Sequence, residues 1–344
     1  MERSIFLIYT GGTIGMKQEH DSGALVPFNF DHILEEVPEL RKFGYRISTY
    51  SFDPVIDSSD ANPDFWVELA VLINKNYLLY DGFVILHGTD TMAYSASALS
   101  FMLENLEKPV VFTGSQLPIG MLRTDGKENL ISSIEIAASV NSAGRPMVPE
   151  VCVFFDNELY RGNRTSKYNA ENFKAFRSYN YPVLARAGIH IKFNTNLINY
   201  PKMWGRKFSV HTVLDTNVTV VRIFPGISVD FLNAVFSVAG LRAVILETYG
   251  SGNAPTEENF LKCIKEAVDE GLIVLNISQC QEGSVEMDTY ATGIALKRAG
   301  VISGYDLTLE SALAKLFYLL GVSSDAVFIK KMLKKNLRGE VSFK

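Results

Sequence analysis

The 344-residue sequence has few cysteines, no strong excess of charge and no long apolar run. Its three cysteines, Cys152, Cys263 and Cys280, form no CxxC pair, which argues against a disulfide framework and against a zinc site. The 33 basic and 38 acidic residues give a formal charge of −5, so the dense positive face that binds nucleic acid is not expected. Apolar runs such as 82–86 and 218–221 are far shorter than the roughly 20 residues that cross a bilayer. We therefore expect no nucleic-acid partner and no membrane partner.

The N-terminus lacks the pattern of a secretory leader. Apolar residues run only from Ile5 to Tyr9 before the polar turn at Thr10, whereas a secretory core needs about 7–15 of them. The odd number of cysteines also suits a reducing compartment. The sequence thus predicts a cytoplasmic protein whose first strand begins almost at once.

Length and patterning indicate two α/β domains. At about 150 residues per domain, 344 residues correspond to two, and 47% hydrophobic with 21% charged residues is the composition of a packed globular chain. Short β-branched or aromatic runs alternate with helical periods, which is typical of doubly wound, mainly parallel sheets. We predict a larger N-terminal domain over 1–193, a linker over 194–217 and a smaller C-terminal α/β domain over 218–344.

The predicted strands and helices bring three polar turns to one edge of the expected parallel sheet. Strands are expected over Ser4–Tyr9, Gly82–Leu86, Val110–Thr113, Val151–Phe155, Thr219–Phe224, Ala243–Glu247 and Leu272–Ile277. Helices are expected over Met92–Leu103, Asn129–Ser139, Asp230–Val238, Glu257–Glu270, Ser311–Leu320 and Asp325–Asn336. In doubly wound sheets, ligands bind outside the carboxyl ends of the strands. The turns after Tyr9, Leu86 and Phe155 emerge there, so this edge is where we expect the chemistry.

The motifs of several enzyme classes are absent or broken. The first turn, Thr10–Gly15, approaches the dinucleotide fingerprint GxGxxG, but Thr10 replaces the first glycine and no acidic residue ends a second strand about 20 residues on. A nicotinamide-dependent dehydrogenase is therefore a weak alternative. The sequence has no Walker, HExxH or GxSxG pattern, and its five histidines have no metal-ligand spacing. His87, at a strand end, is interpreted as a hydrogen-bonded structural imidazole.

Two hydroxyl-bearing turns and one lysine remain as candidate chemistry. Thr13 stands among glycines that let a backbone approach a small ligand, although a capped tight turn explains the same residues. Thr89 and Asp90 place a hydroxyl beside a carboxylate at a strand-to-helix junction, where an N-cap is the ordinary explanation. Lys167 lies in a basic loop, yet a desolvated lysine beside a threonine can serve as a base. At a common edge, a Thr–Lys–Asp arrangement is the best nucleophilic set in this chain.

The same turns carry a family resemblance. Tyr9–Gly15 and Leu86–Ala93 resemble the two signature turns of the bacterial-type L-asparaginase family. Further similar segments are Asp57–Asp60, Phe112–Pro118, Arg161–Lys167 and Tyr249–Pro255. Their order and spacing hold over nearly the whole chain. The pattern is most similar to that of the cytoplasmic type I members.

The resemblance implies a reaction and its residues. L-Asparagine would be hydrolysed to L-aspartate and ammonia, with Thr13 as the nucleophile that forms a β-aspartyl ester. Thr89, Asp90 and Lys167 would form a second triad in which Lys167 polarises the Thr89 hydroxyl. Asp90 would also hold the substrate α-ammonium group. No metal or organic cofactor is implied.

The resemblance also implies substrate contacts and an assembly. Ser58, Ser59 and the Gly88 backbone would hold the α-carboxylate of the substrate. Because each site in the family is completed by a neighbouring subunit, Asn253 would reach across an interface. A homodimer, or a tetramer built from two dimers, is therefore expected.

The sequence departs from the family pattern at two places. One concerns the lid over the active site, and the other concerns an allosteric site. Family members carry a Tyr after the first turn, but residues 17–30 contain none, and Ala24 or Leu25 stands near the expected place. Either the predicted lid over 17–27 works without a Tyr, or Tyr290 supplies the hydroxyl. Glu247 stands where some members have an Arg that contributes to an allosteric asparagine site. A carboxylate there would repel an effector's carboxylate, so we expect no activation at this position.

Other functions stay open at this point. One alternative is an enzyme that hydrolyses both asparagine and glutamine. The two substrates differ by one methylene group, which changes their relative transition-state binding by only about 1–3 kcal/mol. The related subunit of a tRNA-dependent glutamine amidotransferase carries an additional domain ahead of the first turn, whereas eight residues precede Tyr9 here. A non-catalytic amino-acid binding or sensing module would not need Lys167. Measuring ammonia release from L-asparagine and from L-glutamine separates these alternatives.

Overall fold

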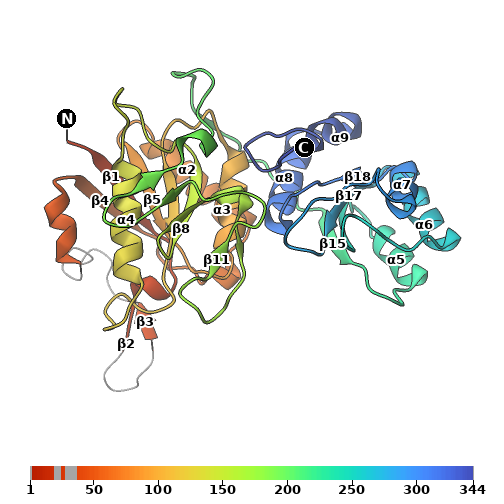
Figure 1. Ribbon diagram of the computed structural model, residues 1–344, viewed down its shortest axis with the longest axis horizontal. Coiled ribbons are helices and arrows are strands. Elements are labelled where there is room, and N and C mark those ends of the chain that lie inside the picture. The colour runs from red at the N-terminus through yellow and green to blue at the C-terminus, as the bar shows by residue number, and fades with distance from the viewer. Residues whose placement is uncertain (1, 19–24, 28–36, 344) are drawn as a thin grey trace. The chain divides into compact units, whose positions relative to one another are not determined.

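The computed structural model describes residues 2–18, 25–27 and 37–343. The chain divides into an N-terminal unit, Met1–Thr212, and a C-terminal unit, Val213–Lys344 (Figure 1). Each contains a mainly parallel sheet with helices, so the predicted α/β architecture with a larger first domain is confirmed. The division falls within the 194–217 stretch, but residues 194–212 belong to the N-terminal unit rather than forming a separate linker.

The N-terminal unit is built on an eight-stranded sheet. Its strand order is β13-β12-β9-β8-β7-β5-β1-β4. The strands are β1 (Ser4–Tyr9), β4 (Arg46–Ser51), β5 (Gly82–Leu86), β7 (Val110–Thr113), β8 (Val151–Phe155), β9 (Glu158–Arg161), β12 (Ala185–Arg186) and β13 (Lys192–Phe193). The five strands from β4 to β8 are parallel, and β9, β12 and β13 continue the sheet antiparallel.

Helices cover both faces of this sheet. The helices are α2 (Pro63–Asn76), α3 (Met92–Met102) and α4 (Gly126–Ala138). Alternate strand residues such as Ile5 and Leu7 pack in one core cluster with Leu130 and Ile134 of α4. The intervening strand residues point to the opposite face, where α3 contacts β7 and β8 and α2 contacts α3. Because both faces of the sheet are buried, the sequences of these strands are continuous apolar runs.

The strand order creates a switch point between β1 and β5. β1 pairs in parallel with β4 on one side and with β5 on the other. The connections from these strands therefore leave in opposite directions, and in sheets of this kind the ligand-binding crevice is expected outside the carboxyl ends of the two strands. This is the edge at which the turns after Tyr9 and Leu86 emerge.

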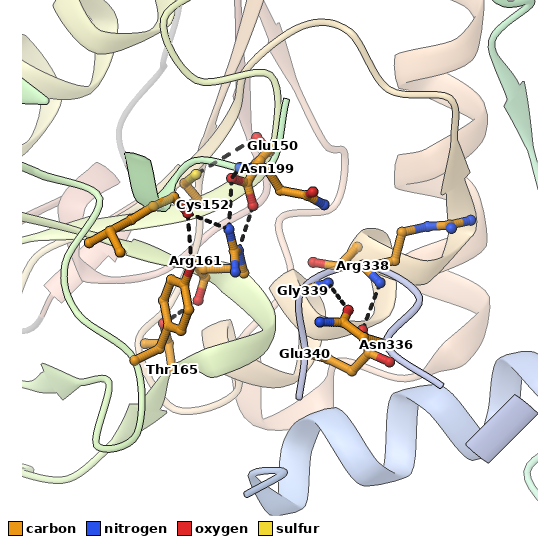
Figure 2. A network of polar contacts seen from close by, with 12 residues as sticks. Glu150, Cys152, Arg161, Thr165, Asn199, Asn336, Arg338, Gly339 and Glu340 are labelled. Carbon is orange, nitrogen blue, oxygen red and sulfur yellow. Dashed lines mark hydrogen bonds and ion pairs between the residues drawn. The ribbon is translucent and has the colours of Figure 1, made fainter. Parts of the chain in front are cut away.

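Shorter elements complete the unit. They are η1 (Thr13–Gly15), β2 (Met16–Gln18), β3 (Leu25–Pro27), η3 (Pro38–Phe43), η4 (Ser58–Asp60), β6 (Leu103–Glu104), η5 (Gly162–Arg164), β10 (Ser166–Lys167), β11 (Phe176–Arg177), η6 (Thr195–Leu197) and β14 (Ser209–Val210). β14 pairs with β6, which joins the segment after residue 194 to the unit. Figure 2 shows a second attachment, in which the buried Glu150 carboxylate binds Arg161 and accepts the backbone N–H of Asn199.

The C-terminal unit has a four-stranded parallel sheet in the order β15-β16-β17-β18. The strands are β15 (Val218–Arg222), β16 (Ala243–Thr248), β17 (Ile273–Ser278) and β18 (Ile302–Ser303), and the helices are α5 (Val229–Phe236), α6 (Glu258–Asp269), α7 (Ala291–Arg298), α8 (Leu309–Val322) and α9 (Ala326–Leu333). Residues of α5, α6 and α7 share a core cluster with Val244 and Leu246. α8 contacts β15 and β16.

Two helices were not expected from the sequence. The N-cap residue of α2 is Asn62, whose side chain accepts the N–H of Phe65, and Pro63 takes the first helical position. This Asn-Pro pair is a helix-start signal. α7 follows Tyr290 and is eight residues long, and the Tyr290 side chain does not cap its first turn. No helix among the described residues is long and apolar enough to span a membrane.

Candidate functional site

The turns after β1 and β5 lie against each other. The backbone N–H and the hydroxyl of Thr10 both donate to the carbonyl oxygen of Leu86 at 3.0 Å. Gly12 has a φ of 90°, and a Cβ there would lie 2.6 Å from the Gly88 Cα. Only glycine permits that conformation and that approach. Thr13 and Thr89, each one residue further along its turn, are thereby placed at the same crevice.

Lys167 joins the Thr89 hydroxyl to the Asp90 carboxylate. Its Nζ donates to Thr89 Oγ1 at 2.8 Å and to Asp90 Oδ1 at 2.6 Å. The lysine side chain is 17% exposed and that of Asp90 is 62% exposed. The lysine side chain is thus largely covered, while its carboxylate partner is open to solvent. The structure brings together the Thr, Asp and Lys that the sequence pattern singled out.

The turn from β9 to β10 delivers Lys167 to this place. The buried Thr165 hydroxyl donates to the carbonyl oxygen of Arg161 at 2.7 Å, which closes the turn over η5 (Figure 2). Beyond it, Lys167 pairs with Phe176 in the β10–β11 ladder. Arg161 is itself held by the Glu150 carboxylate, with its Nε 2.6 Å from Oε2. The basic run is therefore a buried frame rather than a solvated loop.

Ser58 forms the floor of the Gly88 turn. It is buried, and its carbonyl oxygen accepts the Thr91 hydroxyl at 2.5 Å. A Cβ on Gly88 would lie 2.5 Å from the Ser58 Oγ, so residue 88 has to be glycine. Ser59 is exposed, and its N–H and hydroxyl both donate to Asp57 Oδ1, which lowers the pKa of that carboxyl. Ser58 therefore packs under the Gly88 turn, whereas Ser59 contacts Asp57.

The segment after Thr13 returns as a hairpin. β2 pairs antiparallel with β3, and residues 19–24 of the predicted lid lie outside the described residues. Ile14 is buried, and its carbonyl oxygen accepts the N–H of Ile119 at 3.3 Å. This contact attaches the Thr13 turn to the loop that follows β7.

The remaining predicted site residues belong to the C-terminal unit. Asn253 ends a tight turn bridged to Tyr249, and its Oδ1 accepts the Thr292 hydroxyl at 2.6 Å. That contact places Asn253 at the start of α7, where Tyr290 is the N-cap residue and is 55% exposed. Asn253 and Tyr290 therefore occupy one region of this unit.

Glu247 lies near the carboxyl end of β16, opposite Arg222 of β15. It is buried, and burial raises the pKa of its carboxyl, an effect that the charge of Arg222 opposes. The absence of effector activation at this position stays a prediction.

His87 is a structural group, as the sequence analysis interpreted it. Its Nδ1 lies 2.7 Å from the carbonyl oxygen of Gly88, and its Nε2 lies 3.0 Å from the hydroxyl of Ser95, which also accepts the Trp66 indole N–H. Because a carbonyl only accepts, Nδ1 carries the proton and Nε2 accepts from Ser95. Burial lowers the pKa of His87 to about 4, so the ring is neutral at neutral pH.

We expect this burial to make stability depend on pH. The unfolded chain protonates His87 near pH 6.5 and the folded chain only near pH 4, so stability falls as the pH drops through that window, by about 3 kcal/mol in all. Urea titrations followed by tryptophan fluorescence at pH 7 and pH 5 measure the difference. His87→Gln is expected to lose less stability between the two pH values than the unmodified chain. Equal losses in both proteins would contradict the assignment.

One residue that contacts Thr89 received no role from the sequence. Gln116 lies within the Phe112–Pro118 segment that carries the resemblance, but no local pattern gives it a role. In the structure, its Oε1 accepts the Thr89 hydroxyl at 3.5 Å. Its position depends on contacts made far along the chain, which a sequence pattern does not report.

Comparison with known protein families identifies the class of protein to which this fold and crevice belong. The N-terminal asparaginase family model matches residues 4–199, and the model described as the glutaminase/asparaginase C-terminal domain matches residues 217–333. The chain belongs to the asparaginase family. The prediction of this family is confirmed.

Individual relatives narrow the similarity to type I members. The chain is 46% identical to L-asparaginase 1 of Escherichia coli K12 over 343 residues, which are 99% of this chain and 98% of the relative. The crystal structure of L-asparaginase I from Vibrio cholerae is 43% identical, with a TM-score of 0.91 and 100% of both chains covered. A glutamyl-tRNA(Gln) amidotransferase subunit from Pyrococcus furiosus is 34% identical, over 98% of this chain and 77% of the relative.

Proposed function

We propose that this protein hydrolyses L-asparagine to L-aspartate and ammonia through an acyl-enzyme on Thr13. The observation that carries the proposal is the hydrogen-bonded set of Lys167, Thr89 and Asp90 beside the Thr13 turn, at the switch point of a parallel sheet. A binding module has no need of a largely buried lysine aimed at a threonine hydroxyl. The 46% identity to an L-asparaginase over the full chain supports the same activity.

In the first half of the proposed reaction, the Thr13 hydroxyl attacks the side-chain amide carbon. The C–O bond forms, the carbonyl electrons move to oxygen, and their return breaks the C–N bond. The Thr13 proton leaves with the amide nitrogen, so ammonia departs and a β-aspartyl ester remains. Backbone N–H groups of the adjoining Gly-rich turns are the donors available to the oxyanion.

In the second half, water attacks the ester carbon. Its proton returns to the Thr13 oxygen as the ester bond breaks, and L-aspartate is released. Lys167 holds the Thr89 hydroxyl and the Asp90 carboxylate in fixed positions, so Thr89 is placed to orient the attacking water. No metal or organic cofactor takes part in this scheme.

Charge and hydrogen bonding assign the rest of the substrate. The solvent-facing side of the Asp90 carboxylate suits the α-ammonium group, in a charge-assisted contact. The α-carboxylate is assigned to Ser58, Ser59 and the Gly88 N–H. A neighbouring subunit of a homodimer or tetramer would supply Asn253, with Tyr290 as a second contact. A cytoplasmic location is consistent with three free cysteines.

Trapping the intermediate tests the proposal. Acid quenching of a reaction with L-asparagine, followed by peptide mass spectrometry, is expected to show one aspartyl group on the peptide that contains Thr13. Thr13→Ala should carry no such group and should release no ammonia. An ammonia assay with L-glutamine, run in parallel, measures the dual asparaginase–glutaminase alternative. A folded protein that releases ammonia from neither amide would instead support the binding module.

A further inference from the structure

Gln116 reaches the crevice from the loop after β7, and its backbone is fixed there. Its N–H donates to both carboxylate oxygens of Asp125, at 3.0 and 3.1 Å, and the N–H of Leu117 donates to Oδ1 of the same side chain at 3.2 Å. Burial raises the pKa of Asp125, although the backbone N–H groups oppose this effect. The contacts with Asp125 fix the backbone of Gln116, from which the side chain extends.

The orientation of the Gln116 amide is determined by its neighbours. Its Nε2 donates to the carbonyl oxygens of Ala170 and Asn172, at 3.3 and 3.1 Å. Carbonyl oxygens only accept, so the nitrogen has to face this hairpin loop and Oε1 has to face the other way. Both N–H groups are used, and the oxygen is directed at Thr89.

The Thr89 hydroxyl needs this acceptor. The Lys167 ammonium only donates, so it occupies a lone pair of Thr89 Oγ1 and cannot receive the hydroxyl hydrogen. Within the part of the chain that the structure describes, Gln116 Oε1 accepts that hydrogen, at 3.5 Å. A contact of this length is weak, which suits a hydroxyl that has to exchange partners during turnover.

We infer that Gln116 is a positioning residue that directs the Thr89 hydroxyl hydrogen away from Lys167 and toward its own amide oxygen. Thr89 then presents its remaining lone pair to the crevice, as an acceptor for the attacking water. The inference deepens the proposed function and rests on it. Gln116 itself touches neither the substrate nor the reacting atoms in this scheme.

A matched pair of variants separates positioning from simple anchoring of the loop. Gln116→Met and Gln116→Glu both remove the two amide N–H donors, but Glu keeps an oxygen acceptor for Thr89. Gln116→Met is expected to lower kcat by up to about tenfold, the upper limit for the loss of one hydrogen bond, with KM within about twofold. Gln116→Glu is expected to keep kcat within about threefold of the unmodified enzyme.

Two outcomes would overturn the inference. Equal losses of kcat in both variants would make Gln116 an anchor of the loop, and an unchanged kcat in Gln116→Met would show that Thr89 needs no acceptor. The comparison uses whichever carboxamide the unmodified protein hydrolyses, so a substrate other than asparagine changes the proposed function but not this test. A protein that hydrolyses no carboxamide overturns both.

Discussion

Lys167→Met is expected to reduce kcat for asparagine hydrolysis about 10³-fold, the upper end of the effect of removing one preorganised hydrogen-bond donor from an active site. Methionine keeps the length and apolar body of the side chain but has no ammonium to donate to Thr89 and Asp90. Because Asp90 is 62% exposed, water can replace the lost contact and the fold should persist. Steady-state ammonia release gives kcat and KM, and circular dichroism checks the fold.

Lys174→Met is the matched control on the same hairpin. The Lys174 side chain is 47% exposed, and its Nζ lies 3.5 Å from Glu158 Oε2, away from the Thr89 contacts. Lys174 itself is half-exposed, and Arg186 also pairs with Glu158 at 2.9 Å, so activity is expected to stay within about twofold. If Lys167→Met kept a tenth or more of the unmodified kcat, Lys167 would have no central part in the reaction.

The second large effect concerns stability, and we expect Lys315→Met to lower the free energy of unfolding by about 3–5 kcal/mol. Lys315 of α8 and Glu340 of the C-terminal tail are both fully buried, with Nζ and Oε1 2.6 Å apart. Burial lowers the pKa of Lys315, and the Glu340 charge opposes this effect. Removal of the cation leaves a buried carboxylate whose remaining donors are the N–H groups of Leu337 and Arg338.

Two further variants make this prediction specific. Lys297→Met removes a lysine whose pair with Asp288 is 57% and 78% exposed, and it should change stability by less than about 0.5 kcal/mol. Adding Glu340→Gln to Lys315→Met removes the uncompensated charge and should recover part of the loss.

The measurement has to report on the C-terminal unit. Both tryptophans, Trp66 and Trp204, belong to Met1–Thr212, so urea unfolding is followed by circular dichroism at 222 nm rather than by fluorescence. A Lys315→Met variant as stable as Lys297→Met would show that the buried pair does not stabilise the tail.

Figure 2 illustrates how both units use buried carboxylates to hold chain segments. Glu150 binds Arg161 in the N-terminal unit, and Glu340 accepts backbone N–H groups of the turn that begins at Asn336 in the C-terminal unit. Neither role follows from the local sequence, in which each residue has the appearance of an ordinary surface charge. Such groups become visible only when burial and partners are known.

The sequence by itself determined the α/β class, most strands and helices, and the turns that hold Thr13 and Thr89. Apolar runs and glycine-rich turns are local properties, so they can be read along the chain. Tertiary structure alone decided that Lys167 meets Thr89 across 78 positions, that Gln116 faces the 168–175 hairpin, and that Lys315 is buried against Glu340. Those contacts depend on strand register and helix packing, which bring distant residues within hydrogen-bonding distance and exclude water from some of them.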